Sequence, residues 1–258
     1  ETLAYLRAQP DIREAEVFAA ANGNLTVRLN YTSHIPSNGV EEPKSLESYG
    51  LGIRVVLESP EGVKVGFGSE PSDLSLEGAK RALAKARRSA VHDPDFVSLP
   101  KPGKERRTLR RYHDPAVMRI TDRGLVEAGW RVTTKALEAF QASEDLLSLA
   151  GSPDKVRDLG LILGGDVVIL QERAAIGSYH LPRIETDEST LLMSLVTAMV
   201  EEGNAKGTGW QVASRLEQLD GEAAEEECDP RPHEENHRRQ RQHVFDVPPG
   251  IPPRAQLG

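Results

Sequence analysis

Residues 48–69 decide the fold: Ser48-Tyr49-Gly50-Leu51-Gly52-Ile53-Arg54-Val55-Val56-Leu57-Glu58, then Ser59-Pro60-Glu61-Gly62, then Val63-Lys64-Val65-Gly66-Phe67-Gly68-Ser69. Apolar side chains fall at every second position on both sides of the middle tetrapeptide, which is the period of strands with one buried face. Pro60 supplies a preset φ and Gly62 a positive one, as a chain reversal requires. The stretch therefore predicts a β-hairpin over residues 51–69.

The period changes to that of an α-helix after this hairpin. Ser72, Asp73 or Ser75 can cap the exposed amides at its start, and Glu77 suits the positive end of the helix dipole. Lysines and arginines fall mostly outside the apolar face. We predict a helix over residues 75–91. Its apolar face comprises Ala79, Leu83, Ala86 and Ala90.

Two further hairpins are predicted from glycine-containing turns. Residues 14–31 contain Asn22-Gly23, the strongest short hairpin signal, beside a segment of alternating polarity. Residues 156–173 contain Gly164-Gly165-Asp166 between two apolar runs that include β-branched residues. Strand structure is expected from residue 146 onward.

Two other segments complete the predicted architecture. Residues 122–141, capped by Asp122, have a helical apolar face, and we expect Trp130 on the other side, against a sheet edge or a partner. Residues 190–201 also fit a helical face, but we interpret them as a strand because a turn signal follows at Gly203-Asn204. The predicted fold is α/β (α+β), with two layers, a mostly antiparallel sheet built from hairpins, and helices on one face.

Bulk properties exclude several classes of protein. The chain of 258 residues has a net charge of -8, which argues against a sequence-independent nucleic-acid binder. Cys228 is the only cysteine, so no internal disulfide can form, as in a reducing cytoplasm. No apolar run is long enough to span a bilayer and no signal peptide opens the chain, so we expect a cytoplasmic protein without membrane partners.

Two regions differ in composition from the rest. Residues 94–120 are proline-rich and read as a basic linker, although a patch for an acidic partner or a nucleic acid is the alternative. Residues 221–258 are charged, rich in proline and histidine, and nearly free of periodic apolar residues, which predicts a disordered tail after a domain over residues 1–220. The basic cluster of the linker comprises Lys101, Lys104, Arg106, Arg107, Arg110 and Arg111.

The loop around residues 33–43 holds a weak site candidate. His34 and Tyr31 could line a site there, but a solvated loop is the favoured interpretation because no neighbouring residue completes a ligand set.

The order of elements around the first hairpin resembles a known family. A glycine-flanked hairpin, Ser69, the Asp73-Leu74-Ser75 cap and an Ala-rich helix look like the amino-terminal domain of the TldD/PmbA family. The resemblance runs from about Ala15 to about Asp220. Members were named modulators of DNA gyrase and are regarded as metallopeptidases, so it implies a domain that walls the cavity of a homodimer or of a heterodimer with a paralogue, through which unfolded peptides reach zinc.

The resemblance implies that the zinc chemistry lies elsewhere. In the family a His-Glu-x-x-x-His helix and a later cysteine, both in the carboxy-terminal domain, supply the zinc ligands and the catalytic glutamate. Because the resemblance ends near Asp220, that domain is expected to be missing from this chain. We therefore assign residues 1–220 no catalytic, cofactor-binding or metal-binding residue, and expect no bound zinc.

The tail contains a weaker catalytic alternative, His233-Glu234-Glu235-Asn236-His237. In the general His-Glu-x-x-His pattern, His233 and His237 would bind zinc and Glu234 would act as the base, with Cys228 or His243 as a third ligand. The segment lacks the apolar face that holds such a helix against a domain, and its spacing departs from that of the family.

Three functions are thus open. The first is the groove-forming domain of a TldD/PmbA-type metallopeptidase that acts on unfolded peptides. The second is a non-catalytic partner subunit or interaction protein of the same family. The third is a small zinc peptidase that uses the tail motif.

Overall fold

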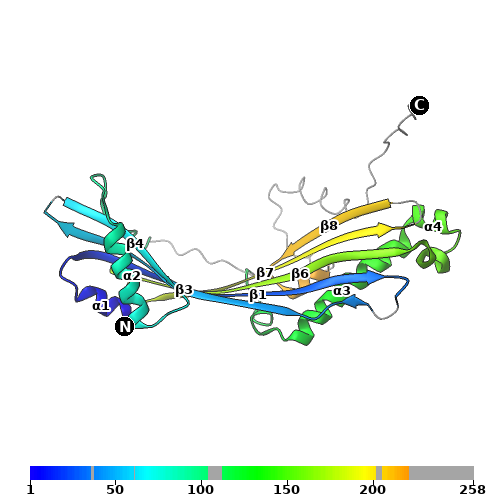
Figure 1. The fold of residues 1–258 in the computed structure, drawn as a ribbon, viewed down its shortest axis with the longest axis horizontal. Helices are drawn as coiled ribbons and strands as arrows, with labels where there is room; N and C mark the ends of the chain where they lie inside the picture. Colours follow the sequence, from blue (N-terminus) through cyan, green and yellow to red (C-terminus); the bar gives the residue numbers. More distant parts are fainter. Residues whose placement is uncertain (36–37, 61, 104–111, 202–204, 221–258) are drawn as a thin grey trace, which may run out of the picture. The chain divides into compact units, whose positions relative to one another are not determined.

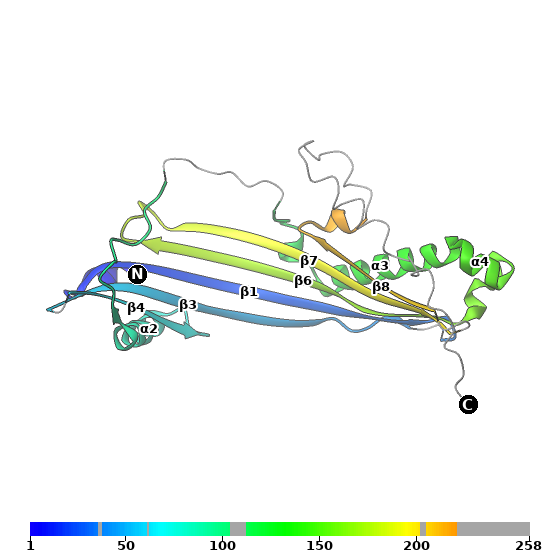
Figure 2. The same cartoon turned by 90° about the horizontal axis from the view of Figure 1, so that it is seen from above.

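The computed structural model describes residues 1–35, 38–60, 62–103, 112–201 and 205–220. Within them the strands form one sheet in the order β5-β4-β3-β1-β6-β7-β8, with β2 paired to β1 (Figures 1 and 2). The strands of the pairs β1–β2, β3–β4, β4–β5 and β7–β8 run antiparallel, which confirms the predicted mostly antiparallel sheet. The strands are β1 (Ile12–Thr32), β2 (Gly39–Val40), β3 (Lys44–Ser59), β4 (Gly62–Pro71), β5 (Val91–His92), β6 (Leu161–Ser178), β7 (Glu185–Val200) and β8 (Ala205–Ala213).

Helices occur before, between and after these strands. None of those within the described ranges is both long enough and apolar enough to cross a bilayer. The α-helices are α1 (Thr2–Arg7), α2 (Leu76–Ser89), α3 (Asp122–Ala142) and α4 (Glu144–Ala150), and the 3-10 helices are η1 (Val117–Arg119), η2 (Pro153–Leu159) and η3 (Leu216–Asp220).

The chain folds into two compact units, and β1, β6 and β7 each contribute residues to both. Unit 1 comprises Glu1–Asn24, Ser45–Asp114 and Leu170–Thr190. Unit 2 comprises the remaining ranges, Leu25–Lys44, Pro115–Ile169 and Leu191–Gly258.

The hairpin predicted over residues 51–69 is confirmed in unit 1. β3 and β4 pair with Ile53 opposite Gly68 and Val55 opposite Gly66, and both apolar side chains are fully buried. α2 packs against this hairpin (Figure 1), so closely that a Cβ added at Gly66 would lie 2.1 Å from the carbonyl oxygen of Ala86. The glycine is therefore required by the close approach of the helix backbone.

The helix predicted over residues 75–91 is confirmed as α2. The Ser75 hydroxyl accepts a hydrogen bond from the Gly78 backbone N–H at 3.2 Å, the expected N-cap contact. The buried face of α2 packs with α1 and the first strands into one core. This core comprises Leu6, Ile12, Ala15, Leu51, Ile53, Val55, Leu57, Ala79, Ala82, Leu83 and Ala86.

The two other predicted hairpins are wrong, because both of their turns are extended strand. β1 runs through Asn22-Gly23, and Gly23 lacks the positive φ that a type I′ turn needs. β6 runs through Gly164-Gly165-Asp166, where a Cβ at Gly165 would lie 1.9 Å from the carbonyl oxygen of Leu195. Gly165 therefore serves the close approach of β7 and not a turn, since pairing with neighbouring strands outweighs the local turn preference.

The helix predicted over residues 122–141 is confirmed as α3 in unit 2. Its N-cap is Thr121 and not Asp122, because the Thr121 hydroxyl accepts from the Gly124 backbone N–H at 3.2 Å. α3 runs along the strands of this unit (Figure 2) and buries Leu125 among them. The core there comprises Val27, Leu29, Val117, Leu125, Val167, Ile169, Leu192, Ala213 and Leu219.

Residues 144–150 and 153–159 are helical, so the prediction that strands begin at residue 146 is wrong, and the first strand of this region begins at Leu161. The Ser143 hydroxyl caps α4, and Gly151 ends it with φ 76°. Pro153 opens η2, and Gly160 ends it with φ 75° immediately before β6. Serine before a helix, proline in its first turn and glycine after it are local signals that outweigh the apolar character of this stretch.

Two smaller predictions also stand. The strand predicted over residues 190–201 is confirmed as β7. Trp130 of α3 lies over Gly39 of β2, where an added Cβ would come within 2.3 Å of the ring. The side chain thus packs against the sheet while remaining partly exposed.

Candidate functional site

An open pocket of about 560 Å³ lies in unit 1. β1 and β6 line it with alanines, whose short side chains leave space above the strands, and β7 adds polar side chains. Leu74, from the loop before α2, also lines it and is half exposed. We call this the alanine pocket. Its lining residues are Ala19, Ala20, Ala21, Leu74, Tyr112, His113, Arg173, Ala174, Ala175, Thr186, Asp187 and Glu188.

Polar side chains at the alanine pocket pair with one another. The Tyr112 hydroxyl donates to Asp187 Oδ1 at 2.5 Å, and this hydrogen bond raises the pKa of Tyr112 above its ordinary value. Arg173 Nε donates to Glu188 Oε1 at 3.2 Å, and His113 Nε2 lies 3.8 Å from the other oxygen of Glu188. Tyr112 therefore stays a neutral hydrogen-bond donor, and the pocket combines an apolar alanine lining with fixed polar groups.

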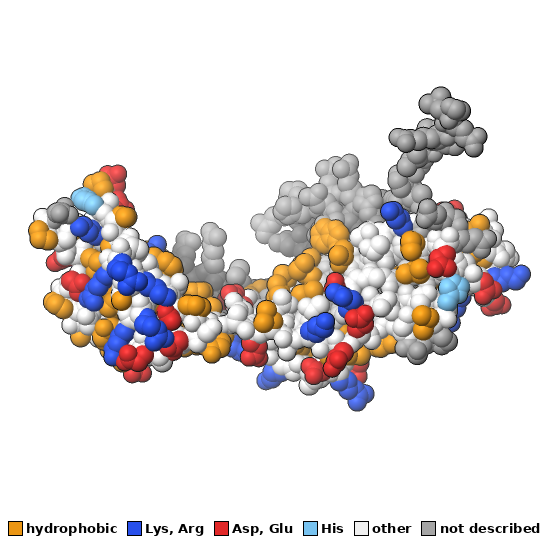
Figure 3. All heavy atoms as spheres, viewed as in Figure 1, with side chains coloured by type: hydrophobic (Ala, Val, Ile, Leu, Met, Phe, Trp, Pro, Cys, Tyr) orange, Lys and Arg blue, Asp and Glu red, His pale blue; other side chains and the backbone are white. Residues whose placement is uncertain are grey.

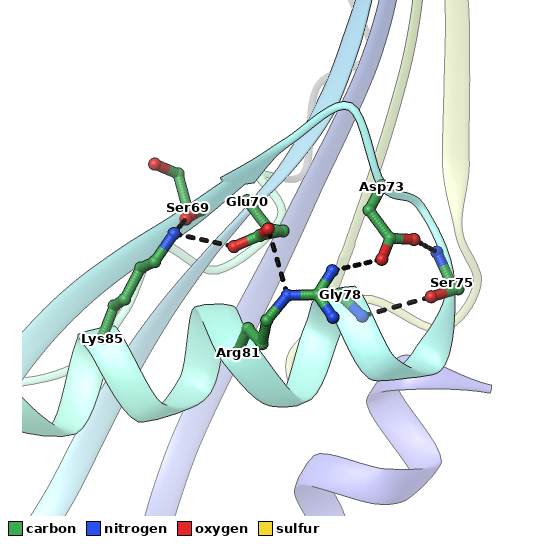
Figure 4. A network of polar contacts seen from close by, with 7 residues as sticks. All are labelled: Ser69, Glu70, Asp73, Ser75, Gly78, Arg81 and Lys85. Atoms are coloured by element: carbon green, nitrogen blue, oxygen red, sulfur yellow. Dashed lines mark hydrogen bonds and ion pairs between the residues drawn. The ribbon is translucent and has the colours of Figure 1, made fainter.

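The loop that carries Leu74 is held by a polar network (Figure 4). Arg81 of α2 donates to Glu70 Oε1 at 3.1 Å and also to Asp73, while Lys85 Nζ lies 2.7 Å from Glu70 Oε2. The hydroxyl and backbone N–H of Ser75, together with Arg81, lower the pKa of Asp73 to about 2. The Asp73-Leu74-Ser75 sequence thus fixes the helix start and places Leu74 at the pocket.

A buried carboxylate anchors another segment of unit 1. Glu14 accepts hydrogen bonds from the Leu99 backbone N–H and from His180 Nε2, both at 2.8 Å. Burial alone would raise the pKa of Glu14, but these two hydrogen bonds lower it below its ordinary value. Arg13 adds a bond to the Val97 carbonyl at 3.3 Å, so this end of the predicted linker is fixed to β1.

The residues singled out near residue 34 do not form a site. His34 Nε2 lies 3.2 Å from Glu201 Oε2, and both side chains are largely exposed. Tyr31 packs against the apolar core that contains Phe140. The favoured interpretation of a solvated loop agrees with this geometry.

The predicted metal residues lie outside the described part of the chain. This holds for Cys228, His233, Glu234, His237 and His243, and for all of the basic cluster except Lys101. Within the described residues, no three His, Cys, Asp or Glu side chains come together in a way that could hold a metal ion. The zinc ion that the resemblance implies therefore has no matching ligand set among these residues.

The sequence reasoning missed the residues of the alanine pocket. Ala19-Ala20-Ala21 and Ala174-Ala175 lie on separate strands that only the sheet pairing brings together. Tyr112-His113 lies within residues 94–120, which the sequence analysis interpreted as a linker. The repeated alanine runs were the one available signal, because alanine is depleted in strands and its short side chain fills little of the space above a sheet.

Comparisons with known proteins identify the fold. No family model and no curated protein matches the chain. The crystal structure of TldE from Thermococcus kodakarensis matches with a TM-score of 0.59 and 14% identity, over 86% of this chain and 45% of TldE.

Two candidate modulators of DNA gyrase match as well. The one from Bacteroides thetaiotaomicron has a TM-score of 0.54 and 11% identity, over 84% of this chain and 44% of its own. The one from Thermotoga maritima has a TM-score of 0.54 and 12% identity, over 87% of this chain and 46% of its own. This chain shares their fold and spans less than half of the length of each, which confirms the resemblance to the TldD/PmbA family at the level of fold.

Proposed function

We infer that this chain is the peptide-binding, groove-forming part of a TldD/PmbA-type metallopeptidase and does not cleave peptides by itself. The observation that carries this proposal is the alanine pocket. Its volume of about 560 Å³ falls in the range of about 300–1,000 Å³ that is typical of ligand sites. An apolar alanine lining beside fixed polar groups suits the backbone and small side chains of an unfolded peptide.

The shared fold and the sequence support the proposal that this chain binds peptides and that another part of the assembly cleaves them. The family's His-Glu-x-x-x-His pattern does not occur anywhere in the 258 residues. Cleavage would then need a second polypeptide part that carries this pattern, in the same assembly. A homodimer, or a heterodimer with a paralogous chain, is part of the proposal, and a non-catalytic partner subunit is its closest variant.

The test measures peptide binding by fluorescence anisotropy, with a labelled, unstructured casein fragment. Leu74→Glu places a carboxylate in the alanine pocket and removes an apolar contact, so we expect affinity to fall by about tenfold or more. Val97→Glu is the control, because Val97 is also an exposed apolar residue of unit 1 but does not line the pocket. Its affinity should equal that of the unaltered chain.

Two results would count against the proposal. Equal affinity of the Leu74→Glu variant would show that peptides do not use this pocket. Cleavage of the fragment by the purified chain, abolished by a chelator and by Glu234→Gln, would instead favour the tail motif as an active site.

A further inference from the structure

Two neighbouring carboxylates of β7 line the alanine pocket, and their surroundings differ. Glu188 faces two basic groups, Arg173 Nε at 3.2 Å and His113 Nε2 at 3.8 Å. Asp187 accepts a hydrogen bond on Oδ1 from the neutral Tyr112 hydroxyl, and among the described residues no basic side chain forms an ion pair with it. The charge of Glu188 is therefore balanced within the pocket, whereas that of Asp187 is not.

The lining of the pocket as a whole carries one uncompensated negative charge. Its two carboxylates, Asp187 and Glu188, stand against one guanidinium, that of Arg173, when the imidazole of His113 is neutral. The other lining residues are uncharged, and most of them are alanines. A concave surface lined by an excess of one sign of charge raises the local concentration of ions of the other sign. The pocket therefore favours a ligand that combines apolar surface with a positive charge.

We propose that the alanine pocket selects peptides that contain lysine, with the lysine ammonium group bound to Asp187. This inference rests on the proposed function, because it concerns which peptides the pocket takes. A lysine side chain joins an apolar methylene stem to a compact charged end with three N–H donors. The stem covers alanines such as Ala174 and Ala175, and the ammonium group reaches the carboxylate beside them.

The hydrogen bond from Tyr112 favours lysine over other cationic groups of a peptide. A guanidinium binds a carboxylate best through both of its oxygens. Because Oδ1 of Asp187 already accepts from Tyr112, Oδ2 is the oxygen left for a ligand, and this suits the point-like ammonium group better. The ammonium group of a peptide's amino terminus has the same charge, but it lacks the methylene stem and leaves the alanines uncovered.

Matched peptides measure this preference by fluorescence anisotropy at neutral pH. The probes are labelled, unstructured peptides of one sequence, blocked at both ends, with lysine, norleucine or arginine at the central position. Norleucine keeps the apolar stem of lysine and lacks the ammonium group. We expect the lysine peptide to bind roughly two- to fivefold more tightly than the norleucine peptide, the gain of a partly exposed ion pair, with the arginine peptide between them. The gain should shrink as the salt concentration rises.

Variants of the chain assign the preference to one carboxylate. Asp187→Asn keeps the shape of the side chain and removes its charge, so the lysine and norleucine peptides should then bind equally. Glu185→Gln is the matched control, because Glu185 lies on the same strand and does not line the pocket, and it should keep the full preference. Carbodiimide joins an amine directly to a carboxylate, so it should attach the lysine peptide mainly at Asp187, as located by mass spectrometry.

The lysine preference and the use of the pocket fail in different ways. Equal affinity of the unaltered chain for the lysine and norleucine peptides, or a preference that survives Asp187→Asn, would overturn the lysine proposal. Binding of the norleucine peptide that falls in the Leu74→Glu variant would still support the alanine pocket as a peptide site. Absence of binding by every peptide would overturn both proposals. A norleucine peptide with a free amino terminus that binds as tightly as the blocked lysine peptide would assign Asp187 to the terminal ammonium group instead.

Discussion

The two units use the exposed faces of their strands differently. Around α2 in unit 1, lysines and arginines gather beside acidic residues (Figure 3), and Arg81 and Lys85 bind Glu70 and Asp73 in one network. In unit 2, β7 is apolar on both faces between Leu191 and Val196, and the described residues cover only one of them. A strand that is polar on one face needs a covering layer only on its apolar face. A strand that is apolar on both faces keeps one apolar face exposed to solvent unless a further layer or a partner covers it.

The covered and uncovered faces of β7 should differ most in their effect on stability. Leu192 is fully buried and Leu195 is about half exposed. We expect Leu192→Ala to lower the free energy of unfolding by about 2–5 kcal/mol, since it leaves a cavity in the core of unit 2. Leu195→Ala should cost less than about 1 kcal/mol. Urea unfolding followed by far-UV circular dichroism measures both, and similar losses would show that both faces of β7 are covered by the chain itself.

Two adjacent glycines of β6, Gly164 and Gly165, test whether this stretch is a turn or an extended strand. An added Cβ at Gly165 would lie 1.9 Å from a backbone oxygen of β7, whereas one at Gly164 has no atom within 4 Å. Gly165→Ala should therefore destabilise the fold by about 1–3 kcal/mol through overpacking. Gly164→Ala should be neutral or stabilise slightly, by less than about 1 kcal/mol. The same urea titrations compare them, and equal effects would favour the hairpin that the structure excludes.

The smallest expected effect concerns pH and the network of unit 1. The pKa of Asp73 is lowered to about 2 by Ser75 and Arg81. A lowered carboxylate pKa stabilises the fold above the ordinary value near 3.8, and this contribution is lost as pH falls from about 4 through about 2. Compared with Asp73→Asn, the unaltered chain should thus be slightly more stable at pH 6, and the two should converge near pH 2. A difference that is constant across this range, in thermal unfolding, would exclude the ionised carboxylate as its cause.

The sequence predicted those elements whose signals are local. The β3–β4 hairpin has its reversal, its alternation and its glycines within a single stretch, and α2 follows with its own cap at Ser75. The alanine pocket could not be predicted in the same way, because Leu74, Tyr112 and Asp187 come from distant parts of the chain. The exposed apolar face of β7 did leave a signal: residues 190–201 fit both a helix and a strand because β7 is apolar on both faces.

The sequence by itself determined the position of those strands and helices that have a clear apolar period or a capping residue. The order of these elements also indicated the resemblance to one family. Only the tertiary structure decided what Asn22-Gly23 and Gly164-Gly165 do. Both residue pairs can form a turn, but they can also continue an extended strand. The free energy of a local turn preference is small compared with that of pairing a long strand with a neighbour on each edge. The same reason applies to the alanine runs and to Trp210 of β8, because their surroundings depend on which strands lie next to each other in the sheet, and this is fixed only when distant parts of the chain pair.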